Sequence, residues 1–432
     1  MPFALVESLD HEGRGVAHDE GKAIFIEGAL PGEQVEYSSY RKKRNFEQAT
    51  CVQIFKPSAL RVTPRCEFFG VCGGCSMQHL EVSAQVAAKQ RVMENAFWHI
   101  ARVKPDVVLP PIYGPAWGYR DRARIGVRVV PETGAVLVGF HEKKSSFIAD
   151  MSSCEVLPRH ISALLLPLRA LIAGLSVPDR ISQIDVCAGS DHSVLMLRNQ
   201  TSLTAQDEAS LLAFGATHGL RMWLQPGGPE TAHPVRKGEE AYLHYTLPEF
   251  GLSLRFRPTD FTQVNVHINR LLIRRAMQLL DPQSGERIAD LFCGLGNFSL
   301  PIAARGAMVV GVEGLASLTQ RASENAALNG LSECSEFRVA NLFEATEKSL
   351  AKLGPLDKLL IDPPRDGAMA VCNALGKQAP RRIVYVSCNP ATLARDAAIL
   401  IKEKGYRLCS AGVANMFPQT SHVESIALFE RV

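Results

Sequence analysis

Hydrophobic and polar positions alternate regularly from about residue 256 to the C-terminus. Short apolar runs, typical of buried strands, take turns with stretches in which apolar residues recur every three or four positions, as in amphipathic helices. The predicted strands are 287–292, 308–313, 336–340, 358–362, 382–388 and 425–430, and the predicted helices are 268–280, 298–305, 317–330, 344–353 and 391–404. This alternation predicts a doubly wound, Rossmann-like parallel sheet whose ligands bind at the carboxyl ends of its strands.

The N-terminal segment has a different pattern, in which short strand-like pieces are separated by turns rich in glycine. The pieces are 3–9, 13–18, 22–30, 32–40 and 47–55. Five short strands in so few residues predict a small OB-like β-barrel. Positive charge is concentrated only at Arg41-Lys42-Lys43-Arg44, followed by Phe46, at a predicted hairpin tip. Such a tip suits a phosphate backbone and an unstacked base, and a solvated charged turn is the alternative.

The middle of the chain mixes both patterns. Helices are predicted over 81–101, 161–175 and 205–220, and strands over 122–130, 135–142 and 192–199. The fold class is therefore α/β with an all-β N-terminal barrel. We expect three domains, namely the barrel over 1–59, a mixed central domain over 60–255 and the α/β domain over 256–432. Residues 90–125 fit either neighbouring domain.

Composition adds limits to this picture. Hydrophobic residues make up 46% of the chain and charged residues 21%, as in globular proteins, and the formal net charge is only +3, so any basic surface must be local. No apolar run approaches the length of a membrane span, and the first residues carry acids where a signal peptide carries bases. We expect a cytoplasmic protein without membrane contact, whose eleven cysteines stay reduced.

A glycine-bearing loop indicates a cofactor site. It follows the predicted strand 287–292 and contains Gly294 and Gly296, which let a ligand approach the backbone closely. The next predicted strand ends in Glu313, whose carboxylate can accept hydrogen bonds from ribose hydroxyls. Ser299 stands where the dinucleotide fingerprint has its third glycine, which favours an adenosyl cofactor without a pyrophosphate.

Two more strand ends carry reactive groups. Asp362-Pro-Pro-Arg365 forms a rigid turn after one strand, because its prolines fix the backbone. Cys388 ends the next strand, just before a helix whose dipole would favour a thiolate. Most isolated cysteines are small buried hydrophobes, but the position beside the Asp-Pro-Pro-Arg turn favours a nucleophile. Glu424 leads into the last strand and could serve as a base.

This pair suits methylation at carbon 5 of uracil. Carbon 5 is a poor nucleophile, and a thiolate that adds to carbon 6 creates an enolate whose charge reaches carbon 5. After methyl transfer a base must remove the carbon 5 proton before the thiol can leave. Cys388 and Glu424 are the minimum set for this chemistry.

Four further cysteines form a candidate metal site: Cys66, Cys72, Cys75 and Cys154. Four thiolates suit either zinc or an iron–sulfur cluster, and the spacing alone does not choose between them. The C-x3-C-x2-C pattern of radical S-adenosylmethionine enzymes is absent, which argues against radical chemistry.

Taken together, the chain resembles the bacterial RNA (uracil-5-)-methyltransferases, most closely the type that modifies 23S rRNA. GRGVA, GALPGE and RKKR resemble the TRAM domain of that family, CEFFGVCGGCSMQH resembles its 4Fe–4S segment, FTQVN resembles its F-x-Q-x-N element, and SCNPATLARD and HVESIALF are long, specific matches. The barrel argues against relatives that lack it, including the transfer-RNA type.

The resemblance implies a role for each candidate residue. S-adenosylmethionine would be bound by Gln263, Phe292, Asn297, Glu313, Asn341 and Asp362. Cys66, Cys72, Cys75 and Cys154 would hold a 4Fe–4S cluster with a structural or RNA-positioning role. Cys388 would be the nucleophile, Glu424 the base, and the protein a monomer that binds 23S rRNA.

Three alternatives stay open. The chain could be a uracil-5-methyltransferase of tRNA or another rRNA site, a cytosine-5-methyltransferase, or a non-catalytic iron–sulfur RNA-binding protein.

Overall fold

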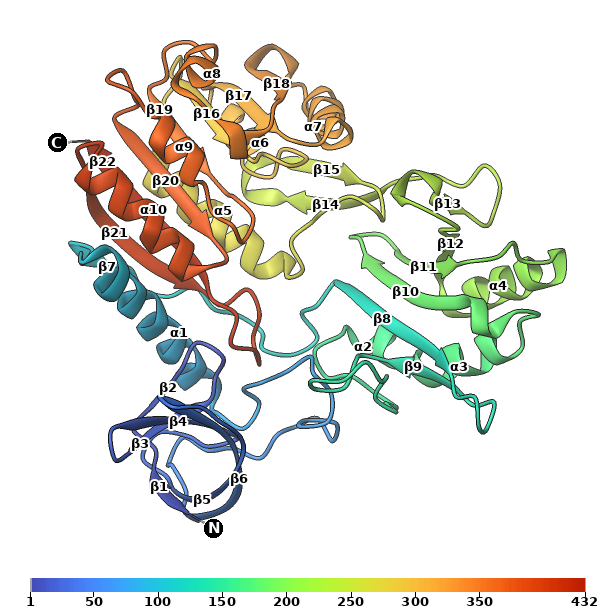
Figure 1. The fold of residues 1–432 in the computed structure, drawn as a ribbon. Helices are drawn as coiled ribbons and strands as arrows, with labels where there is room; N and C mark the ends of the chain where they lie inside the picture. The colour runs from blue at the N-terminus through green and yellow to red at the C-terminus, as the bar shows by residue number, and fades with distance from the viewer. Residues whose placement is uncertain (1, 432) are drawn as a thin grey trace.

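An eight-stranded sheet forms the C-terminal part of the computed structural model, which describes residues 2–431 (Figure 1). In spatial order its strands are β18 (Ser335–Val339), β17 (Met308–Glu313), β16 (Arg287–Leu291), β19 (Lys358–Ile361), β20 (Arg382–Ser387), β22 (Glu424–Arg431), β21 (Tyr406–Ala414) and β7 (Val107–Val108). All neighbouring strands are parallel except that β22 runs antiparallel to both β20 and β21. The prediction of a parallel sheet is therefore wrong for β22, because β21 and β22 are joined by a loop rather than by a crossover helix.

Helices cover both faces of this sheet, as a doubly wound fold requires. One face packs against α5 (Val266–Leu280), α6 (Ser299–Ala303) and α7 (Ala316–Leu328). The other packs against α1 (Val82–Ala96), the π-helical turn η1 (Phe97–Ala101), α8 (Glu347–Ala351), α9 (Met369–Ala374) and α10 (Pro390–Lys402). Successive strand residues such as Ile288 and Ala289 enter opposite cores, so both strand faces are apolar.

The N-terminal strands form a six-stranded sheet that curls into a barrel (Figure 1). In spatial order they are β1 (Phe3–Leu5), β5 (Gln34–Lys42), β6 (Phe46–Lys56), β4 (Lys22–Glu27), β3 (Gly15–Asp19) and β2 (Ser8–Leu9). The single strand predicted over residues 3–9 is divided into β1 and β2. Between them the Val6 N–H donates to the Glu33 carbonyl at 2.9 Å. The predicted hairpin tip is confirmed, since Arg41 and Lys42 end β5 and Lys43 and Arg44 begin the turn to β6.

The central sheet has six strands, three of which (β10, β12 and the two-residue β13) the sequence pattern did not reveal. In spatial order they are β13 (His233–Pro234), β12 (Leu220–Leu224), β11 (Ser193–Asn199), β10 (Ile181–Ala188), β8 (Arg122–Val129) and β9 (Val136–Gly139). The helices of this region are α2 (Arg159–Ser162), α3 (Leu165–Ala173) and α4 (Ala205–His218). β10 and β12 were not predicted because polar side chains interrupt their apolar runs.

Two segments from before residue 256 pack against the C-terminal sheet. α1 and β7 lie on its β21 side, and the hairpin of β14 (Leu243–Leu247) and β15 (Leu252–Phe256) places Leu243, Leu247 and Leu254 in the core with α5. Leu30 of the barrel packs with Met77 and Leu80, just before α1. No helix within residues 2–431 is both long and apolar enough to cross a bilayer.

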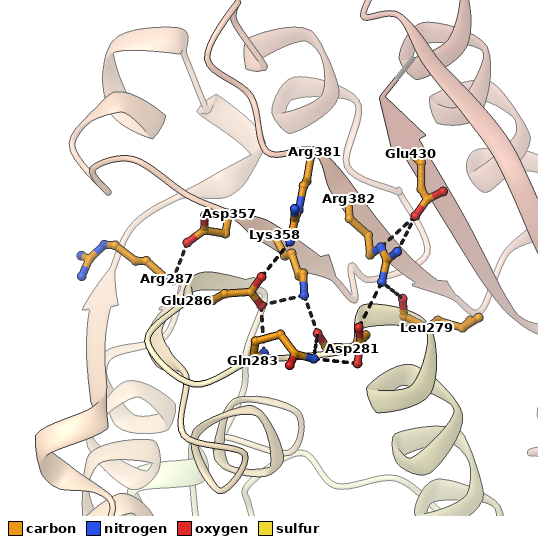
Figure 2. A network of polar contacts seen from close by, with 10 residues as sticks. All are labelled: Leu279, Asp281, Gln283, Glu286, Arg287, Asp357, Lys358, Arg381, Arg382 and Glu430. Atoms are coloured by element: carbon orange, nitrogen blue, oxygen red, sulfur yellow. Dashed lines mark hydrogen bonds and ion pairs between the residues drawn. The ribbon is translucent and has the colours of Figure 1, made fainter.

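Paired charges occupy the edge at which the parallel strands begin (Figure 2). The Lys358 side chain, 1% exposed, places its ammonium 2.6 Å from the Glu286 carboxylate, and Arg381 lies 2.9 Å from the other oxygen of that carboxylate. Arg382 binds Glu430 at 2.6 Å across β20 and β22. Each cation at this edge has an acidic partner, so burying these side chains leaves little uncompensated charge.

We expect Glu286→Ala to lower the free energy of unfolding by about 3 kcal/mol, because it leaves the buried Lys358 ammonium without its carboxylate. Denaturant unfolding followed by circular dichroism measures this change. Glu249→Ala, which breaks a half-exposed pair with Arg270, is the control and should cost less than about 1 kcal/mol. Equal losses in the two variants would contradict this account of the network.

Candidate active site

Four acidic side chains gather at the opposite edge of the sheet. Asp290 lies on β16, Glu313 ends β17, and Asp362 follows β19. Glu424 joins them because β22 is antiparallel, so its first residue lies where the parallel strands end. Within residues 2–431 none of these carboxyl groups forms an ion pair with lysine, arginine or histidine.

Burial and mutual repulsion change the acidity of this cluster. Burial and the nearby Glu313 raise the pKa of Asp290 to about 7. Burial and the neighbouring Asp290 raise the pKa of Asp362 to about 8. The side chain of Glu424 is 3% exposed, and its burial and the nearby Asp362 raise its pKa well above the usual range. The edge therefore holds protons at neutral pH that a bound cation would displace.

The predicted glycine loop follows β16, which carries Asp290, and it hydrogen-bonds to Glu313. The Gly294 N–H donates to one oxygen of Glu313 at 3.1 Å, and the Leu315 N–H donates to the other, also at 3.1 Å. Gly296 has φ +97°, a conformation that side chains rarely adopt. Phe292 has φ +63° without being glycine, and such strain is common where a loop is shaped for a ligand.

Two predicted cofactor residues meet on the α5 side of this loop. The Asn297 side chain accepts a hydrogen bond from the Tyr245 hydroxyl at 2.9 Å and exchanges two bonds of 3.0 Å with Asn269. Gln263 lines a pocket together with Tyr245 and Asn269. The amide of Asn297 is thus held in one orientation, with Gln263 beside the residues that hold it.

Two further predicted cofactor residues are Phe292, which directly follows β16, and Asn341, which follows β18. The Phe292 ring packs 5.6 Å from the ring of Phe343, measured between centroids. Asn341 is exposed just after β18, and its side-chain oxygen accepts the Phe343 N–H at 3.1 Å. Phe343 therefore contacts both Phe292 and Asn341, and no sequence motif predicted this contact.

Cys388 and Glu424 lie on neighbouring antiparallel strands. Ser387 of β20 is paired with Ser425 of β22, so the next residues outward, Cys388 and Glu424, face each other at the sheet edge. Cys388 is partly exposed rather than sealed in the core. The nucleophile and base inferred from sequence are thereby brought together.

The acidity of Cys388 differs from the sequence expectation. Burial and the nearby Glu424 and Asp362 carboxyl groups raise the pKa of its thiol to about 11, although Arg365 opposes this. The expectation that the helix dipole favours a thiolate is therefore wrong for the ligand-free protein. Cys388 stands before the N-cap Asn389, whose own side chain accepts the Ala391 N–H, and burial together with the two carboxyl groups disfavours the thiolate.

Arg365 and His422 are site residues to which sequence reasoning gave no role. The Asn389 side chain donates to the Arg365 carbonyl at 3.1 Å, which ties the Asp-Pro-Pro-Arg turn to the start of α10. The Arg365 guanidinium lies 3.3 Å from His422 Nδ1. Arg365 therefore lies between His422 and the start of α10, and its positive charge favours the thiolate form of Cys388.

The four cysteines of the candidate metal site lie near one another. Charge on Cys66 and Cys72 is felt at both Cys75 and Cys154, and burial raises the pKa of Cys75 to about 12 and that of Cys154 to about 11. The Gly74 N–H points at the Cys72 sulfur at 3.3 Å. As they stand, no group of three or more His, Cys, Asp or Glu side chains in the described residues could hold a metal ion.

The raised pKa predicts that iodoacetamide alkylates Cys388 slowly at neutral pH and faster as the pH approaches about 11, because only the thiolate attacks. Mass spectrometry of the Cys388 peptide measures this rate separately from the other cysteines. Arg365→Gln should move the curve to higher pH, since it removes the cation that favours the thiolate. A rate that levels off near pH 8 would show that the carboxyl groups do not govern this thiol.

Comparison with known proteins agrees with this geometry. The family model described as tRNA (Uracil-5-)-methyltransferase matches residues 239–432, and the TRAM domain model matches residues 4–36. The chain is similar over 99% of its length to the crystal structure of Pyrococcus abyssi tRNA (uracil-54, C5)-methyltransferase in complex with S-adenosyl-L-homocysteine. That chain is covered completely, with a TM-score of 0.76 and 22% identity, which shows a shared fold.

Relatives in sequence are closer. The chain is 65% identical to the 23S rRNA (uracil(1939)-C(5))-methyltransferase RlmD of Aromatoleum aromaticum, with 100% of both chains covered. It is 60% identical to the protein of the same name from Dechloromonas aromatica, again over 100% of both chains. With such identity over the full length, the chain belongs to the RlmD family of 23S rRNA (uracil-C5)-methyltransferases.

Proposed function

We propose that this protein transfers a methyl group from S-adenosylmethionine to carbon 5 of one uridine in 23S rRNA, through a covalent bond between Cys388 and carbon 6. The single observation that carries the proposal is the pairing of β20 with β22, which sets a partly exposed Cys388 opposite a buried Glu424. The relatives are named for uridine 1939, and we propose the same substrate here.

The carboxyl-rich edge suits S-adenosylmethionine, which supplies a sulfonium cation when bound. Burial and the neighbouring carboxyl groups raise the pKa values of Asp290, Asp362 and Glu424, and a positive charge beside them would favour their ionised forms. Glu313 lies where a ribose would be bound. Gln263, Phe292, Asn297 and Asn341 surround the same loop and would complete the pocket.

The chain's own groups account for the two proton movements of the reaction. The Cys388 thiol loses its proton to solvent as its sulfur bonds to carbon 6, and Arg365 stabilises the thiolate form. The electron pair of the resulting enolate would then attack the methyl group from carbon 5, while the methyl–sulfur bond breaks and its electron pair stays on the sulfur of the departing thioether. Glu424 finally takes the carbon 5 proton, whereupon the electrons of that C–H bond restore the ring double bond and expel the Cys388 thiolate.

We also propose a 4Fe–4S cluster on Cys66, Cys72, Cys75 and Cys154. Each of Cys75 and Cys154 is influenced by the charge of Cys66 and Cys72. Four thiolates suit either zinc or an iron–sulfur cluster, and the likeness of residues 66–79 to the family's 4Fe–4S segment favours the cluster. Backbone N–H groups directed at Cys72 and Cys154 suit sulfurs that carry negative charge.

RNA binding by the barrel completes the proposal. The exposed Arg41 to Arg44 tip, between β5 and β6, provides cations for phosphates at the end of a TRAM-containing barrel. Methyl transfer involves no net oxidation or reduction, so we assign the cluster a structural role rather than a redox role.

We expect Cys388→Ala to abolish methylation while S-adenosylhomocysteine still binds, because the sulfur is needed only for attack on the ring. Glu424→Gln should instead accumulate a methylated protein–RNA adduct that resists denaturant, because the carbon 5 proton stays in place. Tritiated S-adenosylmethionine with 23S rRNA, gel electrophoresis and nucleoside analysis measure all three outcomes. Turnover by Cys388→Ala would exclude the covalent mechanism, and a labelled nucleoside other than 5-methyluridine would exclude the substrate.

A second expectation concerns pH. The affinity for S-adenosylmethionine should rise on the order of tenfold between about pH 6 and pH 9, because Asp290 and Asp362 ionise near 7 and 8 and their carboxylates attract the sulfonium. S-adenosylhomocysteine, which is neutral at sulfur, should show a much flatter profile. Calorimetry with both ligands measures the difference, and Asp362→Asn should reduce the slope. Parallel profiles would mean that the carboxyl groups do not sense the sulfonium charge.

A further inference from the structure

The base Glu424 is presented by a loop, residues 415–423, that connects β21 to β22. Figure 1 shows this loop leaving the sheet toward the segment that precedes α1. It has no regular secondary structure, and Gln419 within it has φ +67°, which costs energy for a residue that is not glycine. Contacts from outside the loop must therefore hold it in this shape.

Lys89 of α1 makes the most unusual of these contacts. Its side chain is 2% exposed, and its ammonium donates to the Asn415 side-chain oxygen at 2.6 Å and to the Phe417 carbonyl at 2.8 Å. Burial lowers its pKa to about 7. Lysine is almost never buried without a carboxylate partner, because removing the charge from water is costly. An apolar side chain would fill this position at a lower desolvation cost. We therefore attribute the presence of lysine here to its two hydrogen bonds with the loop.

Gln85, one turn earlier on α1, makes a second contact with the loop. Its side-chain nitrogen donates to the Gln419 side-chain oxygen at 3.0 Å, and its oxygen accepts the Gln419 N–H at 2.9 Å. This reciprocal pair holds Gln419 in its left-handed conformation. One face of α1 thus fixes the loop at three positions, namely 415, 417 and 419.

A short chain of contacts leads from Lys89 to the site. The Phe417 carbonyl that accepts from Lys89 also accepts the Thr420 hydroxyl at 2.9 Å, and the Thr420 oxygen accepts the His422 N–H at 3.3 Å. The His422 ring packs 5.4 Å from the Phe417 ring and lies 3.3 Å from the Arg365 guanidinium. A shift of the Phe417 carbonyl would therefore move His422 and, two residues later, Glu424.

We infer that Lys89 is a positioning residue for the proton-removal step: its ammonium fixes the 415–423 loop so that Glu424 faces Cys388. The inference rests on the proposed function, in which Glu424 is the base. Within residues 2–431 the Lys89 ammonium hydrogen-bonds to the 415–423 loop and to neither Cys388 nor the glycine loop, so its loss does not directly remove a group used in attack on the ring or in methyl transfer. Its loss slows the one step that needs Glu424 in position.

The test compares Lys89→Met, which keeps the length of the side chain and removes its charge, with Lys358→Met, which removes the other deeply buried lysine at the far edge of the sheet. Lys89→Met should lower turnover on the order of tenfold or more. It should also accumulate the methylated, denaturant-resistant protein–RNA adduct during turnover, with S-adenosylhomocysteine affinity unchanged. Lys358→Met should destabilise the fold without accumulating adduct, and Lys89→Arg should restore part of the turnover.

Glu424→Gln is run beside these variants to separate the two ideas. If Glu424→Gln accumulates no adduct, the proposed function is at fault. If Glu424→Gln accumulates adduct but Lys89→Met loses turnover without it, or turns over normally, the inference about Lys89 is overturned. Gln85→Met removes the other contact between α1 and the loop, and it replaces Lys89→Met in the test if that variant does not fold. Gln85→Met should also accumulate the adduct. A loss of turnover without adduct would again overturn the inference.

Discussion

The constraint on which this structure depends is the distribution of charge along one sheet. At the edge where the parallel strands begin, each buried cation has a carboxylate partner, as Lys358 has Glu286 (Figure 2). At the other edge Asp290, Asp362 and Glu424 lie together, and their burial and mutual proximity raise their pKa values. Burying carboxyl groups without partners opposes folding, so an arrangement of this kind is expected where a cationic ligand supplies the missing charge.

The reversal of β22 is what completes the second edge. In an all-parallel sheet the start of the last strand would lie beside Lys358, far from the ends of β16 and β20. Because β22 runs antiparallel, its first residue, Glu424, reaches the same edge as Cys388. The connection from β21 to β22 contains no helix, and it is the 415–423 loop that leads to Glu424. Because α1 contacts this loop, the position of Glu424 depends on α1.

The sequence allows candidate residues to be proposed, but it does not show the electrostatic forces that act on them. Cys388 and Glu424 could be proposed because each stands at a strand end in a distinctive motif. The pKa of Cys388 could not, since it depends on Glu424 and Asp362, which lie close only after the sheet has formed. The burial of Lys89 could not be predicted either, because a lysine within a helix is usually solvent-exposed. Its burial follows only from the packing of α1 against the 415–423 loop.

The same electrostatics explain how one site can serve two opposite needs. If S-adenosylmethionine binds beside these carboxyl groups, its positive charge favours the ionised form of Glu424 before the reaction. Methyl transfer leaves a neutral thioether, so the proton affinity of Glu424 returns toward the high value set by its burial and by Asp362. In the proposed mechanism Glu424 would then be a stronger base at the step that requires one, when carbon 5 carries both the methyl group and its proton. A carboxylate paired with a fixed arginine would lack this response, which is a physical reason for leaving Glu424 without a cationic partner.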